Sequence, residues 1–234
     1  MKLAIVIPTY KYHIPVLKRT LESVAQQTCP PDLVIVRASS CDAKCSGILA
    51  ELRLFPWPFP LTILETENVQ YAGQNRNEGV AAVPDDIDII SFFDSDDLMH
   101  PRRIEFVKQY IAEGYDVVCH GFTGLPWNMT EEPVPVVESY IKYETVRAAF
   151  TGELVKVGRV IFLDKNDDEV GFTDGPLTLR KECFNGYASD QRGHQECLFF
   201  SGLHRAGYKV INLNMGLMIY TPTSATELLE KHLP

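Results

Sequence analysis

The sequence predicts an α/β fold with a mostly parallel central sheet and helices on both faces of that sheet. Short apolar runs alternate with helical patterns through residues 3–114, and this alternation implies right-handed βαβ units. The runs are continuously apolar, which is typical of parallel strands that are buried on both faces. The 15 glycines and 15 prolines are an ordinary share of 234 residues, so collagen-like and low-complexity chains are excluded.

In the first half of the chain, each expected element has a local signal. Four strands are expected at residues 3–7, 33–36, 61–64 and 87–93, each a short apolar run. Four helices are expected at residues 15–29, 46–54, 72–82 and 101–113, where apolar residues recur on one face or where proline and glycine mark a boundary. Strand and helix alternate in the order that βαβ units require.

The second half has weaker signals. Strands are expected at residues 155–163, 175–180 and 209–213. Helices are expected at residues 139–150, at residues 198–206 and from the capping box Ser224-x-x-Glu227 onward. Because no linker or internal repeat divides the chain, and 234 residues suit one domain, we expect a single domain over residues 1–234.

Charge and cysteine content exclude several classes of protein. The formal net charge is −9 at pH 7, whereas a general nucleic-acid binder needs lysine and arginine to neutralise phosphates. The six cysteines are scattered, and the CxxxC spacing of Cys41 and Cys45 does not match a zinc site. No apolar run reaches the roughly 18 residues of a membrane span, and no signal peptide precedes the first strand. We therefore expect a soluble, cytoplasmic protein with no nucleic-acid partner.

The residues that follow the strands are the first candidates for a site, because ligands bind beyond the carboxyl ends of parallel strands. These are residues 8–10, residues 37–42 and the motif Asp94-Ser95-Asp96-Asp97. Three carboxylates within four residues repel one another unless a cation lies between them. They suit a hard divalent cation that keeps open positions for phosphate oxygens. A solvated acidic turn before the next helix gives the same pattern.

The motif Gly73-x-x-Arg76-Asn77-x-Gly79 lies at the start of the helix expected over residues 72–82. A helix N-terminus with an arginine can hold a phosphate or the edge of a nucleotide. A surface arginine, with glycines that permit close packing, explains the same residues.

Taken together and in this order, the motifs resemble the family 2 glycosyltransferases, which have the GT-A fold. The resemblance covers roughly residues 3–110 and 175–213. It is carried by Ala4-Ile5-Val6-Ile7-Pro8-Thr9-Tyr10, Leu21-Glu22-Ser23-Val24-x-x-Gln27-Thr28, Gly73-x-x-Arg76-Asn77-x-Gly79, Phe93-Asp94-Ser95-Asp96-Asp97, Gly175-Pro176-Leu177-Thr178-Leu179-Arg180 and Gln195-Glu196 before Gly207-Tyr208. The resemblance implies a single GT-A domain, with residues 1–115 as the nucleotide-sugar-binding half and residues 116–234 as the acceptor-side half.

The resemblance also implies an activity. A sugar would move from a nucleoside-diphosphate-sugar to a hydroxyl of a glycan or another acceptor, with inversion at the anomeric carbon. Mn²⁺ or Mg²⁺ would neutralise the leaving diphosphate. By position, the resemblance implies that Pro8, Thr9 and Tyr10 surround the nucleobase and ribose and that Arg76 lies beside the nucleobase or the phosphates. Asp94 and Ser95 would contact the nucleotide, and Asp94 and Asp96 would bind the metal. Glu196 would be the catalytic base.

The sequence departs from the family pattern at two places. After the second strand the family shows two acidic residues, one of which accepts the N3 proton of uracil, but here Arg37-Ala38 stands. Arginine only donates hydrogen bonds and fits the acceptor atoms of guanine. We therefore expect a UDP-sugar donor, with a GDP-sugar as the alternative, and Arg37 is a candidate for binding the nucleotide. The other interpretation is that Arg37 is a surface residue that forms an ion pair with an aspartate. The second departure is Gln195-Glu196 in place of Glu-Asp, which leaves one carboxylate on a longer side chain.

Four further residues are lesser candidates. His194 and Asp97 are candidates for binding the acceptor or the metal, and a polar surface position is the alternative for His194. Trp127 is a candidate for stacking on a sugar ring, and packing under a loop is its alternative. His232 is a candidate for closing over the diphosphate, and a frayed chain end is its alternative.

Two other functions remain open. A sugar-phosphate nucleotidyltransferase predicts a glycine-rich phosphate loop with a basic residue directly after the first strand, where this chain has Pro8-Thr9-Tyr10-Lys11. A catalytically silent sugar-nucleotide-binding protein fits the altered pair Arg37-Ala38. Turnover of the donor to free nucleoside diphosphate distinguishes such a protein from an enzyme. The sequence leaves the oligomeric state open.

Overall fold

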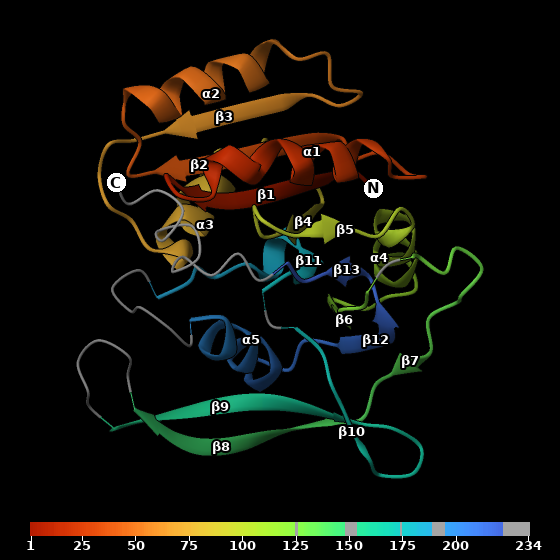
Figure 1. Ribbon diagram of the computed structural model, residues 1–234. Helices are drawn as coiled ribbons and strands as arrows, with labels where there is room; N and C mark the ends of the chain where they lie inside the picture. The colour runs from red at the N-terminus through yellow and green to blue at the C-terminus, as the bar shows by residue number, and fades with distance from the viewer. Residues whose placement is uncertain (125, 148–153, 174, 189–194, 222–234) are drawn as a thin grey trace.

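An eight-stranded sheet runs through the computed structural model, which describes residues 1–124, 126–147, 154–173, 175–188 and 195–221 (Figure 1). The strands are β1 (Leu3–Tyr10), β2 (Leu33–Ser39), β3 (Leu61–Glu65), β4 (Ile89–Phe92), β5 (Leu98–Met99), β6 (Val117–Gly121), β7 (Pro135–Val136), β8 (Ser139–Arg147), β9 (Leu154–Leu163), β10 (Glu169–Val170), β11 (Thr178–Arg180), β12 (Val210–Gly216) and β13 (Met218–Ile219). The helices are α1 (Leu17–Ala25), α2 (Ala43–Leu54), α3 (Ala72–Ala81), α4 (Arg103–Ala112) and α5 (Gln195–Arg205), with short 3-10 helices η1 (Ile14–Val16) and η2 (Lys181–Cys183). His194, His232 and the helix expected from Ser224 lie outside the described residues.

The strands of the large sheet follow the order β3-β2-β1-β4-β11-β6-β12-β7. Strands β1 to β4 pair in parallel, and so do β6 and β12. Strand β11 is antiparallel to its neighbours β4 and β6, and β7 is antiparallel to β12. The sheet is therefore mostly parallel, as predicted, and β11 joins strands from the two halves of the chain.

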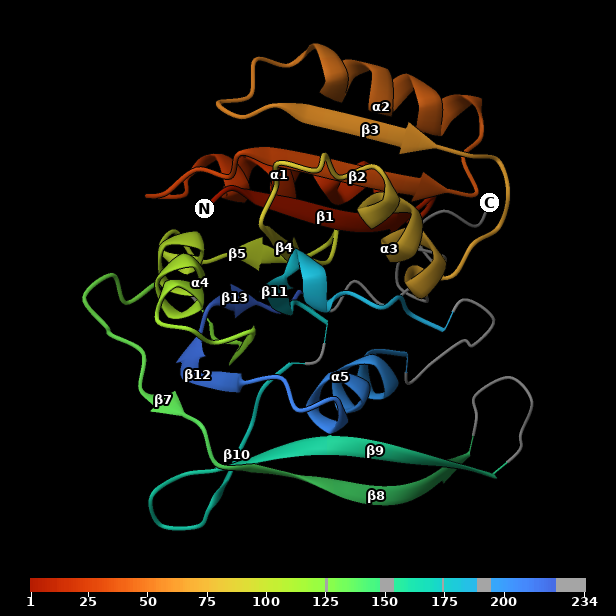
Figure 2. The same ribbon diagram turned by 180° about the vertical axis from the view of Figure 1, so that it is seen from behind.

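Helices cover both faces of the sheet, which confirms the prediction. Leu3, Ile5 and Ile7 of β1 belong to one apolar core together with residues of α1, α2 and α4. Ala4 and Val6 belong to a second core together with residues of α5. Successive side chains of a strand point to opposite faces, so one apolar run serves both cores. Figure 1 shows α1 in front of β1, and Figure 2 shows α3 on the reverse side.

The helix predicted over residues 139–150 is wrong for the part that the structure describes. Residues 139–147 form β8, which pairs antiparallel with β9 from Ser139 opposite Phe162 to Arg147 opposite Leu154. Aromatic and β-branched residues dominate this segment, and they favour a strand. Both strands lie beneath α5 (Figure 1), where the rings of Phe162 and Phe200 pack with centroids 6.3 Å apart. The partner strand and α5 supply the pairing and the burial that a helix would have lacked.

The other elements predicted within the described residues are present, with shifted ends. Helix α2 begins at Ala43 because Asp42 caps it, its side chain accepting a hydrogen bond from the Cys45 N–H at 2.9 Å. Strands β1 and β2 continue beyond their predicted ends, to Tyr10 and Ser39. None of the helices formed by the described residues has the length and apolar character needed to cross a bilayer.

Helix α3 approaches β1 so closely that Gly79 has no room for a side chain. A Cβ atom on Gly79 would lie 2.5 Å from Cγ1 of Val6. We expect Gly79→Ala to lower the free energy of unfolding by about 1–3 kcal/mol, the usual effect of overpacking. The matched control is Gly47→Ala in α2, where a Cβ would meet nothing within 4 Å; it should raise the free energy of unfolding by up to about 1 kcal/mol through helix propensity. Urea denaturation measures both, and equal effects of the two changes would contradict the close approach.

Candidate active site

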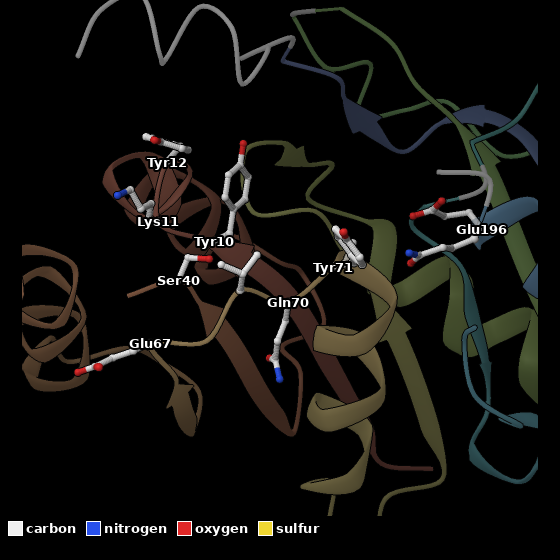
Figure 3. A pocket seen from close by; sticks show the side chains of 11 residues that line it. Tyr10, Lys11, Tyr12, Ser40, Glu67, Gln70, Tyr71 and Glu196 are labelled. Atoms are coloured by element: carbon white, nitrogen blue, oxygen red, sulfur yellow. The ribbon is translucent and has the colours of Figure 1, made fainter. Parts of the chain in front are cut away.

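Three cavities lie at the carboxyl ends of β1 and β4. The largest, here called the outer cavity, has a volume of about 780 Å³ and lies between residues 10–12, the segment around Gln70 and the start of α5 (Figure 3). The acidic cavity, of about 270 Å³, is lined by residues that follow β1 and β4. The α5 cavity, of about 330 Å³, is lined in part by Gly175, Pro176 and Tyr220.

Most of the predicted site residues line these cavities. Those of the acidic cavity are Pro8, Thr9, Tyr10, Asp94, Ser95 and Asp96. Glu196 lines both the outer cavity and the α5 cavity, and Asp94 lines both the acidic cavity and the α5 cavity. Figure 3 shows Tyr10 and Glu196 on opposite sides of the outer cavity. The three cavities are therefore neighbours, at the sheet edge where ligands of parallel sheets bind.

The acidic turn after β4 is held by α1. Thr20 donates from its hydroxyl to the backbone carbonyls of Ser95 at 2.8 Å and Asp97 at 2.9 Å. Arg19 donates to the backbone carbonyl of Asp96 at 2.7 Å. These bonds fix the backbone of the turn, so the Asp94 and Asp96 carboxylates face the acidic cavity from a fixed position.

Asp94 and Asp96 are the described residues best placed to hold a divalent cation. Two carboxylates in one cavity fit Mn²⁺ or Mg²⁺, which take oxygen ligands and leave positions for water or phosphate oxygens. No cluster of three His, Cys, Asp or Glu side chains with metal-binding geometry occurs among the described residues. His13 also lies here, with Nε2 3.8 Å from Oδ2 of Asp96. Sequence analysis missed His13 because a single histidine after β1 has no metal-binding spacing.

Arg76 connects the acidic turn to α5. Its side chain is 2% exposed, and it donates to Oδ1 of Asp94 at 2.9 Å and to Oε1 of Glu196 at 2.5 Å. The guanidinium also lies 5.2 Å from the ring centroid of Tyr187. Burial by itself lowers the pKa of Arg76, but the Glu196 and Asp94 carboxylates outweigh burial, so this pKa is raised. One buried cation therefore fixes the two predicted site carboxylates on either side of it.

Gln195 attaches the first turn of α5 to the first turn of α3. Its side-chain oxygen accepts the backbone N–H of Gly73 at 2.6 Å, and Gln195 is 3% exposed. A Cβ on Gly73 would lie 2.2 Å from that same oxygen, so the contact requires glycine. Gln195 and Glu196 thus each contact α3 through their side chains. At the position where the family pattern has glutamate, Gln195 supplies a neutral side-chain oxygen that accepts a backbone N–H.

Arg37 lies away from the three cavities. Strand β2 continues to Ser39, so Arg37 lies within the sheet instead of following the strand. Its side chain is 10% exposed, forms an ion pair with Glu78 of α3, and donates from Nε to Glu78 at 2.7 Å. It lines none of the three cavities. The structure thus shows Arg37 paired with an acid, although the acid is a glutamate and the arginine side chain is mostly buried.

The lesser candidates differ in position. Asp97 lines the α5 cavity, is 1% exposed and accepts the backbone N–H of Thr221 at 2.9 Å. Its pKa is raised to about 8, chiefly by burial and also by the charges of Asp94 and Asp96. Metal ligands must be deprotonated, so Asp97 suits a metal less well than its neighbours do. Trp127 lines none of the three cavities and packs edge-on against the ring of His100, with centroids 4.9 Å apart.

Fold and site together define an α/β domain with an acidic turn beyond the fourth strand and a glutamate at the start of a later helix. Comparison with known proteins identifies its family. The sequence model described as glycosyl transferase family 2 matches residues 4–170, which is more than half of the chain. The chain therefore belongs to glycosyl transferase family 2.

Solved structures confirm the GT-A fold. Residues 1–349 of TarS from S. aureus, in complex with UDP, superpose with a TM-score of 0.63 at 16% identity, covering 99% of this chain and 63% of that one. The mannosyltransferase PcManGT from Pyrobaculum calidifontis, in complex with GDP-Man and Mn²⁺, gives a TM-score of 0.63 at 15% identity, covering 96% and 58% of the two chains.

A curated relative gives a closer match over a shorter length. An uncharacterized glycosyltransferase from Haemophilus influenzae is 31% identical over 117 residues, which are 49% of this chain and 36% of the relative. The chain thus spans about a third of the curated relative and about 60% of the solved chains.

Proposed function

We propose that this protein transfers a sugar from a nucleoside-diphosphate-sugar to an acceptor hydroxyl. The observation that carries the proposal is the bridge by Arg76, through which the Glu196 carboxylate lies beside the acidic turn that lines the acidic cavity. A base beside the donor site is what attack by a hydroxyl on the sugar requires. Membership of glycosyl transferase family 2, and neighbours of the same fold solved with UDP or with GDP-Man, support the assignment.

In this proposal Asp94 and Asp96 hold Mn²⁺ or Mg²⁺ against the diphosphate of the donor. The ion, when bound, neutralises charge on the leaving diphosphate. Pro8, Thr9, Tyr10 and Ser95 surround the nucleoside, since they line the same cavity as the two aspartates. The Mn²⁺ in the complex of the mannosyltransferase PcManGT supports the choice of metal.

Glu196 accepts the proton of the acceptor hydroxyl as that oxygen attacks C1 of the sugar. A carboxylate has lone pairs for several hydrogen bonds, so Glu196 can accept from Arg76 and from the hydroxyl at the same time. The C1–O bond to the diphosphate breaks on the opposite side, and the anomeric centre inverts. Arg76 keeps the Glu196 carboxylate in position throughout.

The donor we propose is a UDP-sugar, with a GDP-sugar as the alternative. Arg37 was the reason to consider guanine, but its side chain pairs with Glu78 and lines none of the three cavities. That position weakens the argument for guanine. The solved neighbours include both nucleotides, UDP in TarS and GDP-Man in PcManGT.

The acceptor is proposed to bind on the side of residues 116–234, with residues 1–115 holding the donor. Two exposed aromatic rings, those of Phe122 and Tyr220, lie 6.2 Å apart there, and Tyr220 lines the α5 cavity together with Glu196. Exposed aromatic faces suit the apolar face of a sugar, which supports a glycan acceptor. The six cysteines are free thiols, as in reducing compartments, and we propose a cytoplasmic location.

Nucleotide binding is expected to depend on a divalent cation and on Asp96. UDP with Mn²⁺ at 100 times its Kd should stabilise the wild type by about 2.7 kcal/mol, measured by thermal shift and calorimetry. Asp96→Ala should lose the part of this binding that EDTA removes, because one of two metal ligands is gone. The control Asp85→Ala changes a fully exposed acid at the other end of β4 and should bind as the wild type does.

Unchanged Mn²⁺-dependent affinity in Asp96→Ala would contradict the metal assignment. Release of free UDP from a panel of UDP-sugars with glycan acceptors tests turnover. Tight binding of UDP without release of UDP from any donor would favour the catalytically silent sugar-nucleotide-binding protein.

A further inference from the structure

Arg103, the first residue of α4, is a buried cation that the proposed mechanism does not use. It is 0% exposed, and it donates from Nε to Nε2 of His120 at 2.7 Å and from Nη1 to the Ser91 hydroxyl at 2.8 Å. Burial lowers the pKa of His120 well below its ordinary range, so this partner is neutral. Because burying a charge is costly, the hydrogen bonds of Arg103 must offset a large loss of hydration.

The remaining nitrogen of the guanidinium joins two segments of the candidate site. Nη2 of Arg103 donates to the backbone carbonyl of Phe92 at 3.2 Å and to that of Pro176 at 2.9 Å. Phe92 ends β4, two residues before Asp94, and Pro176 lines the α5 cavity. The Phe92 N–H also donates to the Leu177 carbonyl at 2.8 Å. Arg103 therefore fixes the backbone before the acidic turn against the backbone at Pro176.

His120 orients the guanidinium and supports the same wall of the α5 cavity. Its Nε2 accepts from Arg103, so the proton of the neutral ring is on Nδ1, which donates to the Gly121 carbonyl at 2.9 Å. The backbone carbonyl of His120 accepts the N–H and the hydroxyl of Thr173, both at 3.0 Å. Thr173 lines the α5 cavity together with Pro176. Arg103 and His120 thus hold this wall from α4 and from β6.

Gly175 brings that wall against Asp94. A Cβ on Gly175 would lie 2.8 Å from Oδ2 of Asp94, so this carboxylate oxygen occupies the space that a side chain would fill. The other oxygen, Oδ1, accepts from Arg76 at 2.9 Å. The Asp94 carboxylate is therefore held between Arg76 on one side and the backbone at Gly175 on the other.

We propose that Arg103 is a positioning residue for the Asp94 carboxylate and acts through the Gly175-Pro176 backbone, with His120 orienting the guanidinium. This inference rests on the proposed function, in which Asp94 holds a divalent cation against the donor diphosphate. Without Arg103, the Pro176 carbonyl loses a buried donor and the wall at Gly175 is free to shift. The carboxylate would then keep its contact with Arg76 but lose the surface that limits its rotation. Groups that orient a metal ligand in this way affect metal binding without touching the metal.

The first test compares two arginines that join α4 to β11. Arg103→Met should weaken the Mn²⁺-dependent binding of UDP by about 10–100-fold, the usual effect of losing a group that orients a metal ligand. Arg103→Lys should lose less, because lysine keeps a charged donor for a carbonyl. The matched control is Arg180→Met: Arg180 of β11 donates to the Ile111 carbonyl of α4 at 2.6 Å but lines none of the three cavities. It should lower the melting temperature and keep wild-type affinity, both measured by calorimetry.

The second test changes the wall without changing Arg103. The methyl group of Gly175→Ala would displace Oδ2 of Asp94, so the Mn²⁺-dependent affinity for UDP should fall at least about tenfold. The matched control is Gly171→Ala, where a Cβ would meet nothing within 4 Å; this variant should bind UDP as the wild type does. Because Gly175→Ala leaves the buried network intact, it also serves if Arg103→Met fails to fold.

The outcomes separate the role of Arg103 from the proposed function. Loss of affinity in the Arg103 variants and in Gly175→Ala, with both controls unchanged, supports the positioning role. Wild-type affinity in a folded Arg103 variant or in Gly175→Ala, or an equal loss in Arg180→Met, overturns that role and leaves the proposed function intact. A wild type that binds neither UDP nor GDP in the presence of Mn²⁺ or Mg²⁺ contradicts the proposed function itself.

Discussion

Glu196→Gln is expected to lower kcat by about 10²–10⁴-fold, the usual contribution of a positioned base. The amide keeps the size of the side chain and an oxygen that can accept from Arg76, so UDP and Mn²⁺ should bind nearly as in the wild type. Steady-state kinetics with a UDP-sugar measures the change, and calorimetry measures nucleotide binding. The matched control is Glu67→Gln, which changes another carboxylate that lines the outer cavity and should keep near wild-type turnover.

This comparison also tests the alternative that Glu196 is only an ion-pair partner of Arg76. In that case Glu196→Gln would lower the melting temperature and leave kcat close to that of the wild type. A variant with wild-type turnover would move the base to another residue or favour a retaining mechanism.

The alternating strands and helices of the first half were predictable because each signal is local. An apolar run of about five residues followed by polar residues indicates a buried strand wherever it occurs. The convergence of residues 8–10 with residues 94–96 was predictable too, because the carboxyl ends of parallel strands meet at one edge. The structure places both segments around the acidic cavity.

Strand β8 was not predictable in the same way. Its partner β9 and its cover α5 come later in the chain, and a window of residues 139–150 contains neither of them. Strand propensity reflects packing against neighbours more than an intrinsic preference, so a segment without a visible partner was assigned to a helix. The error is one of long-range pairing.

The position of Arg37 depended on where β2 ends. With a strand expected to end at residue 36, Arg37 would follow the strand and reach the ligand edge. The strand in fact continues to Ser39, and Arg37 points toward Glu78 of α3. A shift of three residues at one strand end therefore moved a predicted ligand contact into an ion pair behind the site.

The contacts of Arg76 join parts of the chain that sequence patterns do not relate. Its partners Asp94 and Glu196 stand 18 and 120 residues away. The sequence identified all three residues but assigned them to separate roles. Only the hydrogen bonds between α3 and the start of α5 show that one guanidinium serves both carboxylates.

Arg76→Met is expected to be the most damaging single change to the stability of the site. It removes a cation that is 2% exposed and leaves two carboxylates facing each other. Removing one partner of a buried pair costs about 3–5 kcal/mol, and the exposure of Asp94 and Glu196, 37% and 27%, favours the lower end of that range. A loss of about 3 kcal/mol corresponds to a melting temperature lower by roughly 6–12 °C for a domain of this size. The surface control Arg53→Met removes an ion pair with Glu65 and should cost no more than about 1 kcal/mol.

The same variant distinguishes lost charge balance from lost packing. If the damage comes from unbalanced carboxylates, the triple variant Arg76→Met, Asp94→Asn, Glu196→Gln should recover most of the lost stability, because replacing all members of a buried ionic group is often nearly neutral. If it comes from lost packing against Tyr187, the triple variant should stay as unstable as Arg76→Met. Denaturant unfolding decides between the two.

In either case Arg76→Met should lower kcat by about 10²-fold or more, since Glu196 loses the contact that fixes its position. Turnover equal to that of the wild type would show that the bridge does not serve the reaction.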